Sequence, residues 1–292
     1  MPIEVEKLLS YPIPVVRQTL TRQQTAFYAL SVGVGADPLN ERQLRYVDYC
    51  RDLQALPSLA LVLGHPGFWL GDARSGVDPK SVVHGEQELT LHSELPVEGE
   101  IIGETRIIGL VDKGVGNGAL LYTRKEVRSA ADGRLLASTL NTTFLRGGGG
   151  FGGDSSALRS SHALPEGKPD FCIDLPTRPE QALYYRMNGD NNPLHADPAV
   201  AMAAGFSRPI LHGLCTFGIV CHALLSTLAN YDASRLRSMA LRFSSPVLPG
   251  ETIRSEIWRD GSFRARVLER DALVVSNGLA SFAADPAQRC VG

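Results

Sequence analysis

The spacing of apolar residues predicts a long helix in the second half of the chain. Between residues 214 and 228 apolar side chains recur every three or four positions, the pattern of a helix that commits one face to a core. The members of this stripe are Leu214, Phe217, Cys221, Leu224, Leu225 and Leu228. We expect this helix to begin near His212 and Gly213.

A period of two predicts strands in the first half. Residues 82–95 alternate in the manner of a half-buried strand, and residues 95–104 give a turn followed by another strand. Residues 119–127 and 135–145 predict two further strands joined by a turn. With a helix expected within residues 21–34, these elements make an α+β unit.

The second half repeats this pattern. Residues 273–282 echo residues 135–144, and residues 247–251 echo residues 95–100. Such self-similarity signals a duplicated unit. We therefore predict two copies of one module in which a helix packs on a sheet.

The predicted modules are residues 1–146 and 171–292, and residues 147–170 join them. The run GGGGFGGDSS at residues 147–156 is typical of a flexible connector. Glycines of this kind can also form a phosphate-binding loop, but the GxxxxGK[ST] pattern is missing. The connector is therefore the better interpretation.

Size and charge are consistent with two modules and give no sign of a polyanionic partner. The chain has 292 residues, whereas a single domain usually has about 100 to 200. Hydrophobic residues make up 43% of the chain, which is enough for a core. The formal net charge of -2 provides no basic excess for nucleic acid or an anionic membrane. A local basic pocket for a phosphorylated cofactor remains compatible with it.

The cysteines and the chain ends indicate a reducing compartment. The odd number of cysteines and the lack of a CxxC pair favour free thiols and argue against a metal site. These cysteines are Cys50, Cys172, Cys215, Cys221 and Cys290. We see no leader pattern, no apolar run near the roughly 20 residues of a membrane span, and no peroxisomal address at residues 289–292. We expect a cytoplasmic protein.

Residues 189–195, GDNNPLH, place an acid and an imidazole among turn-forming residues. On such a loop Asp190 and His195 can fold back to face one site, as a proton-transfer pair requires. Taken singly, such an aspartate often only caps a turn, and a histidine is often structural. We assign that structural role to His212 and His222.

Two helix starts follow this loop. Asp197 before Pro198 predicts the beginning of a short helix that Gly205 ends. At the second start, Gly213 carries no side chain that would keep a substrate carbonyl away. The unpaired N–H groups and partial positive charge of a helix N-terminus can stabilise an oxyanion there.

These residues together resemble the signature of the MaoC-like family of (R)-specific, type-two enoyl-CoA hydratases. The motif Gly-Asp-x-Asn-Pro-Leu-His matches residues 189–195, flanked by Tyr185 and Asp197. A second motif, Pro-Ile-Leu-His-Gly-Leu-Cys-Thr-Phe-Gly, matches residues 209–218. The opening Tyr-Ala-Leu-x-Val-Gly of the long hydratases matches residues 28–33.

The resemblance implies an α+β double hot-dog, two repeats of a long central helix wrapped by an antiparallel β-sheet. It also implies reversible syn hydration of trans-2-enoyl-CoA to (3R)-3-hydroxyacyl-CoA in fatty-acid metabolism. Asp190 and His195 would hold the water, and the Gly213 N–H would stabilise the thioester oxygen. No metal and no cofactor is expected. Acyl-CoA, water and a second copy of the chain are the implied partners, because relatives are often homodimers.

The resemblance further assigns contacts with the substrate. The residues expected to line its tunnel or to hold the CoA moiety are His84, Gly85, Lys113, Asn191, Asn192, Pro193, Leu194 and Phe243. Since the Asp-His pair occurs only in the second half, the first half is expected to form a roomier channel for the acyl tail. The family commonly carries a glutamate where this chain has Asp48 and Tyr49, which is a departure from the pattern.

Two other functions fit the same fold. Hot-dog modules also host acyl-CoA thioesterases, and a module without turnover could bind or scaffold acyl-CoA. The complete Asp-His signature favours hydration over both.

Overall fold

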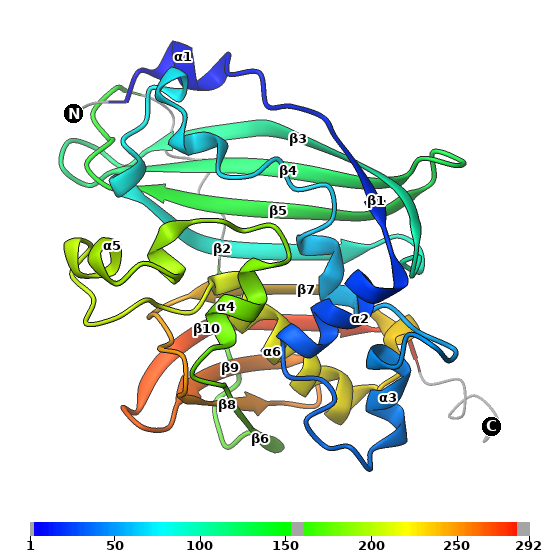
Figure 1. Ribbon diagram of the computed structural model, residues 1–292. Coiled ribbons are helices and arrows are strands. Elements are labelled where there is room, and N and C mark those ends of the chain that lie inside the picture. Colours follow the sequence, from blue (N-terminus) through cyan, green and yellow to red (C-terminus); the bar gives the residue numbers. More distant parts are fainter. Residues whose placement is uncertain (1–2, 153–160, 285–292) are drawn as a thin grey trace.

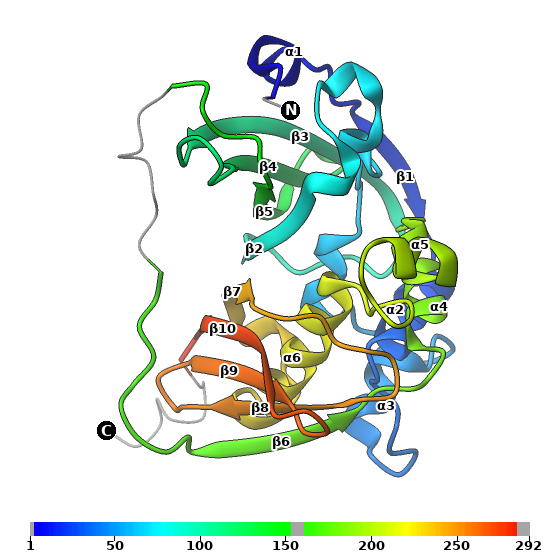
Figure 2. The same cartoon turned by 90° about the vertical axis from the view of Figure 1, so that its left-hand side faces the viewer.

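The computed structural model describes residues 3–152 and 161–284, and within them the chain forms one antiparallel sheet of 10 strands. The sheet curls around helices that cover its inner face (Figures 1 and 2). The strands are β1 (Val16–Leu20), β2 (Val82–Leu91), β3 (Gly99–Asp112), β4 (Ala119–Ser129), β5 (Leu135–Leu145), β6 (Phe171–Pro176), β7 (Leu236–Phe243), β8 (Thr252–Ile257), β9 (Ser262–Val267) and β10 (Ala272–Phe282). The helices are α1 (Val5–Leu9), α2 (Arg22–Ser31), α3 (Glu41–Val47), α4 (Gln181–Arg186), α5 (Pro198–Ala203) and α6 (Gly213–Leu228). No helix in this described part combines the length and apolarity needed to cross a bilayer.

The order of the strands is the same in the two halves when each is counted from its outer edge. The full order is β1-β3-β4-β5-β2-β7-β10-β9-β8-β6. Each half thus runs first, third, fourth, fifth, second strand, and the second strands β2 and β7 pair with each other at the centre. The repeated sequence pattern at residues 135–144 and 273–282 falls on the corresponding strands β5 and β10.

Helix α6 is the centre of the core. It spans Gly213–Leu228, as the apolar stripe predicts, and every residue from Cys215 to Leu225 is buried. Gly218 permits a close approach to the end of α2, since a Cβ at this position would lie 2.6 Å from Cγ1 of Val32. The helix is buried on all sides because the end of α2, the 3₁₀ turn at residues 57–61 and the second half of the sheet enclose it.

Residues 3–152 contain no equivalent long helix, which corrects the expectation of one in each module. Between β1 and β2 lie the short helices α2 and α3 and a series of 3₁₀ turns, of which η1 (Pro57–Leu61) packs against α6, β2 and β5. The reason is in the sequence PSLALVLGHPGFWLG at residues 57–71. Prolines and glycines recur every few positions there, and each interrupts a helix.

Part of the predicted connector is held in place. The backbone N–H groups of Gly150 and Gly152 each donate to the Asp112 carboxylate, at 2.8 and 2.7 Å. A flexible connector is therefore the wrong description of residues 147–152, because a buried acid anchors them. Residues 153–160 of the same run lie outside the described part of the chain.

The turn after η1 touches the sheet through two glycines. A Cβ on Gly103 of β3 would lie 2.0 Å from the Gly64 carbonyl oxygen, so the two backbones meet without room for a side chain. We expect Gly103→Ala to lower the free energy of unfolding by at least about 2 kcal/mol, measured by urea unfolding, because the backbone cannot give way cheaply.

Gly109→Ala on the same strand is the matched control. Its Cβ would meet the Tyr122 ring at 3.4 Å, an ordinary contact, so its stability should stay close to that of the parent chain. Equal stabilities of the two variants would show that the contact between Gly64 and Gly103 is not constraining.

Candidate active site

The loop that carries the acid and the imidazole is held by its own side chains. After α4 ends at Arg186, Gly189 adopts a φ of 109°, and Oδ1 of Asp190 accepts from the Asn192 N–H at 3.1 Å. The Asn192 side chain in turn accepts from the Leu194 N–H at 3.0 Å and caps a short 3₁₀ turn that ends at His195. Turn chemistry therefore returns the chain on itself, as the sequence predicts.

The next helix then begins as predicted. Oδ1 of Asp197 accepts from the Ala199 N–H at 2.8 Å, Pro198 is the first residue of α5, and Gly205 follows its end. This cap fixes the direction in which the chain leaves the loop.

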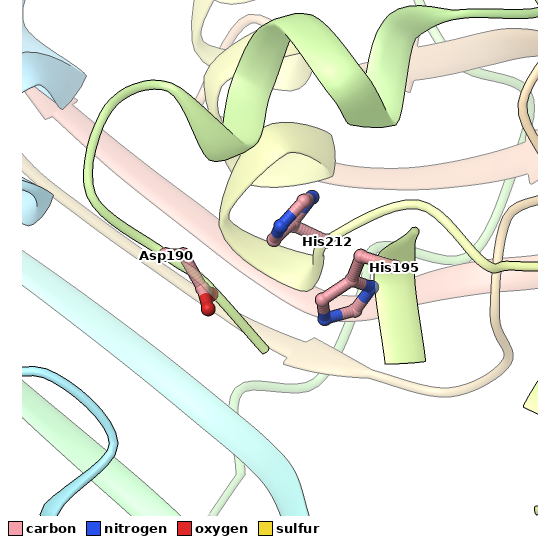
Figure 3. Close-up of side chains that lie close together, drawn as sticks. All are labelled: Asp190, His195 and His212. Carbon is pink, nitrogen blue, oxygen red and sulfur yellow. The ribbon is translucent and has the colours of Figure 1, made fainter. Parts of the chain in front are cut away.

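Asp190, His195 and His212 converge (Figure 3). One side-chain nitrogen or carboxylate oxygen atom of each residue lies within 4.8 Å of those of the other two. The rings of His195 and His212 stack, with centroids 3.8 Å apart and an interplanar angle of 29°. An acid from the loop and an imidazole held against a second ring thus share one small space, where they can act together.

The hydrogen bond of His195 fixes its tautomer. Its Nδ1 lies 2.8 Å from the Ile210 carbonyl oxygen. Because a carbonyl can only accept, Nδ1 carries the hydrogen and Nε2 keeps a free lone pair. Burial lowers the pKa of His195 below its usual value, while the Ile210 carbonyl and Asp190 oppose that change. A neutral imidazole with an open acceptor nitrogen is suited to take up a proton.

His212 is the residue whose importance the sequence analysis underestimated. It is the residue before α6 and is 1% exposed, and burial together with the nearby His195 lowers its pKa to about 2. It therefore presents a neutral ring against His195. The sequence feature that could have indicated this role is the position of His212 directly before Gly213, the first residue of α6. The other histidine assigned a structural role, His222, lies within α6 and pairs with the Tyr231 hydroxyl at 3.0 Å.

Gly213 lies where the loop cluster meets the sheet. It is the first residue of α6, where helix geometry leaves backbone N–H groups without intrahelical partners. A Cβ at this position would come within 3.3 Å of the Phe243 ring. Phe243 in turn packs edge-on against the His84 ring, with centroids 4.7 Å apart. Two of the residues expected to contact substrate thus surround the start of α6.

A bulge in β2 turns His84 inward. The register with β5 shifts between His84 and Glu86, so that His84 and Gln87 both point to the inner face of the sheet. Gly85 sits in the bulge, where a Cβ would lie 3.0 Å from the Thr142 carbonyl oxygen. Burial lowers the pKa of His84 to about 4, and its Nε2 has no hydrogen-bond partner within the described chain.

The structure does not bring Lys113 to this face. Its side chain is exposed, with Nζ 5.5 Å from the centroid of Phe144. Phe144 and Asn141 are an odd number of residues apart on β5, so they point to opposite faces of the sheet. Lys113 is consequently separated from the inner face on which His84 lies. Residues Asn191, Asn192, Pro193 and Leu194, by contrast, belong to the loop itself.

Asp48 lies away from the site. It follows the end of α3, where it accepts from the Cys50 N–H and pairs with Arg51 at 3.1 Å. Helix α3 is fastened to the far end of α6, since the Tyr46 hydroxyl donates to the Tyr231 carbonyl. The length of α6 separates that end from Gly213 by about 24 Å, at about 1.5 Å per residue. Asp48 does not take the place of a catalytic acid.

Comparison with known proteins places both halves in known families. Residues 160–278 match the family described as MaoC like domain, and residues 19–147 match the MFE-2 hydratase 2 N-terminal domain. The chain is 36% identical to probable enoyl-CoA hydratase 2 of Dictyostelium discoideum, over 96% of this chain and 97% of that protein.

Solved structures agree with this placement. The crystal structure of a MaoC-like dehydratase from Phytophthora capsici superimposes with a TM-score of 0.83 at 31% identity, over 97% of this chain and 100% of the other. A Mycobacterium tuberculosis protein described as a double hot-dog matches with a TM-score of 0.58 at 16% identity, over 92% and 93%, which supports the fold alone. The predicted α+β double hot-dog is confirmed, and this chain belongs to the MaoC-like enoyl-CoA hydratase 2 family.

Proposed function

We propose that this protein is an (R)-specific enoyl-CoA hydratase that catalyses reversible syn hydration of trans-2-enoyl-CoA to (3R)-3-hydroxyacyl-CoA. The observation that carries the proposal is the convergence of Asp190 and His195 beside the start of α6. Membership of a family of hydratases and dehydratases makes it a hydro-lyase. The acyl-CoA thioester and water are its substrates.

The tautomer of His195 suggests how the work is divided. A water molecule held between Asp190 and Nε2 of His195 gives its proton to Nε2 while its oxygen forms the bond to C3. The electron pair of the C2–C3 double bond moves toward the thioester, and the imidazolium then delivers the proton to C2 on the same face. Asp190 orients the water and stabilises the imidazolium. One group that both takes and returns the proton accounts for syn addition.

Gly213 supplies the stabilisation of the developing enolate. Its backbone N–H lies at the positive end of the helix dipole, and no side chain obstructs a thioester oxygen there. An oriented donor of this kind lowers the activation barrier by on the order of 3 kcal/mol. His84, Gly85, Phe243 and the loop residues Asn191 to Leu194 would line the substrate path. Lys113, on the other face of the sheet, would contact the outer part of CoA.

The same cluster is a poor metal site. The lone pair of an imidazole nitrogen lies in the plane of its ring, so two rings stacked at 29° with centroids 3.8 Å apart hold their lone pairs in separate, nearly parallel planes. A metal ion needs ligands that converge at about 2.0 to 2.1 Å. We therefore propose that hydration needs no metal or cofactor.

We also propose that the protein forms a homodimer and is cytoplasmic.

Thioester hydrolysis is the alternative on this fold. It would release free CoA thiol, which a thiol reagent detects, whereas hydration removes enoyl absorbance without releasing thiol. An (R)-specific dehydrogenase coupled to the second assay reports the configuration of the product.

We expect Asp190→Asn and His195→Gln each to lower kcat by at least about a hundredfold, because the first removes the charge that orients the water and stabilises the imidazolium, and the second removes the base. The measurement is loss of enoyl absorbance with crotonyl-CoA. Asp197→Asn and His222→Gln are the matched controls, since an asparagine still caps a helix and His222 lies away from the cluster. Near-parent rates in both loop variants would exclude the mechanism.

The pH dependence follows from the pKa of His195. Burial lowers it from 6.5, so the neutral base persists below that pH and is lost only on further acidification. We expect kcat/KM for hydration to be level at neutral pH and to fall along an acid limb centred below pH 6.5. A limb centred above 6.5 would mean that the base is another group.

His212 is expected to act as a positioning residue through its stacked ring. His212→Ala should lower kcat by about tenfold with a smaller effect on KM, because His195 loses the surface that orients it. His212→Phe retains a flat ring and should recover most of the rate. If the phenylalanine variant is as slow as the alanine variant while both melt at similar temperatures, a ring nitrogen of His212 is required instead.

A further inference from the structure

The inner face of the first-half sheet is polar. In its register, Thr123 of β4 lies opposite Asn141 of β5, which lies opposite Gln87 of β2. One step further along, Lys125 lies between Thr105 of β3 and Thr139 of β5 in the same way. All of these side chains line one cavity of about 60 Å³, together with Leu61, His65, Pro66, Trp69 and Leu214.

The second half shows that the fold does not demand this polarity. On β9, the strand that corresponds to β4, the inward side chains are Phe263, Ala265 and Val267, all fully buried in the core around α6. In the first half the same surface is not covered by a long helix and carries hydroxyl, amide and ammonium groups. Polar groups hidden from bulk water are costly unless something binds them.

Two polar atoms on this face, one of them in the cavity lining, have no hydrogen-bond partner among the described residues. Oγ1 of Thr105 is buried without a hydrogen bond, and so is Nε2 of His84 on the same face. The amide nitrogen of Gln87, by contrast, donates to the carbonyl oxygens of Glu88 and Leu140. The unsatisfied positions call for a ligand that offers a hydrogen-bonding atom within the cavity.

Lys125 limits the charge of that ligand. Its ammonium donates to the carbonyl oxygens of Ala60, Leu61 and Leu63 at 3.1, 2.7 and 2.7 Å. An ammonium has three donors, so none remains for a carboxylate. Burial also lowers the pKa of Lys125 to about 7, which weakens its charge at neutral pH. The free groups are those that suit a neutral hydroxyl or keto oxygen.

The cavity reaches the first turn of α6. Leu214, which follows Gly213 in the first turn of α6, is part of its lining. Along β5, the polar rows at Asn141 and Thr139 lie about 7 and about 14 Å beyond Thr143, the residue opposite His84, at about 3.4 Å per residue. An acyl tail that leaves the Gly213 end and follows the sheet passes both rows.

We propose that the preferred substrates are enoyl-CoA thioesters of medium length whose acyl tail carries a neutral hydroxyl or keto oxygen, read by the rows around Thr123, Asn141, Thr105 and Thr139. This inference rests on the proposed hydratase function. No long helix covers this part of the sheet within residues 3–152, and the cavity lined by these polar groups would serve as a specificity pocket.

The test compares matched substrates with the intact protein. Hydration of trans-2-octenoyl-, decenoyl- and dodecenoyl-CoA is measured beside the ω-hydroxy and ω-carboxy analogue of each. We expect kcat/KM for at least one ω-hydroxy compound to exceed that of its plain counterpart by at least about tenfold, because a site built to bind a hydroxyl discriminates against the analogue without it. Plain chains that perform as well at every length would overturn the inference, and so would a preference for the ω-carboxy series.

Two variants on one strand then locate the effect. Thr139→Val removes a hydroxyl from the inner face with little change in volume, and should reduce the hydroxyl preference several-fold. Thr142→Val makes the same change on the opposite face of β5, where Thr142 lies opposite Glu86, and should keep the parent preference. Equal loss in both variants would refute the assigned rows. Absence of hydration with every enoyl-CoA would instead refute the proposed function itself, and the inference with it.

Discussion

The burial of α6 is the constraint on which the site depends. Its residues from Cys215 to Leu225 have no exposed face, so the helix cannot rotate or slide without opening the core. Its first residue, Gly213, is thereby fixed in front of Phe243 and His84. The segment just before the helix also supplies the carbonyl of Ile210 that sets the tautomer of His195. A single packed element therefore positions both the proposed oxyanion donor and the proposed base.

Duplication of the strand order has left the two halves with different interiors. The second half uses its sheet to enclose a helix, and the apolar side chains of β9 belong to that core. In the first half the chain between β1 and β2 is interrupted by prolines and glycines, and the inner face of the sheet carries polar groups around a cavity. The halves thus keep one topology and divide the tasks of fixing the reacting groups and receiving the rest of the substrate.

Sequence reasoning succeeded where the signal was local. The stripe from Leu214 to Leu228 gave α6, the alternation gave β4 and β5, and the turn chemistry of residues 189–195 brought Asp190 and His195 together. It failed where the outcome depended on packing. His212 stacks on His195 although the two residues are far apart in sequence, and no turn or helix pattern encodes this contact. The position of Lys113 beside Phe144 also depends on packing, because Lys113 lies in the loop after β3 and no strand pattern sets the direction of its side chain.

Residues 3–152 lack the long helix that repetition of the strands predicts. Pro57, Gly64 and Pro66 interrupt the segment in which that helix would lie. What replaces the helix is a set of hydrogen bonds: the buried Lys125 binds three carbonyl groups of residues 60–63, which an unbroken helix would have satisfied internally. An ammonium is a costly group to bury, and it is retained here because it closes the backbone of a turn that cannot close itself. Its cost is therefore tied to the absence of the helix, and the cavity beside it exists for the same reason.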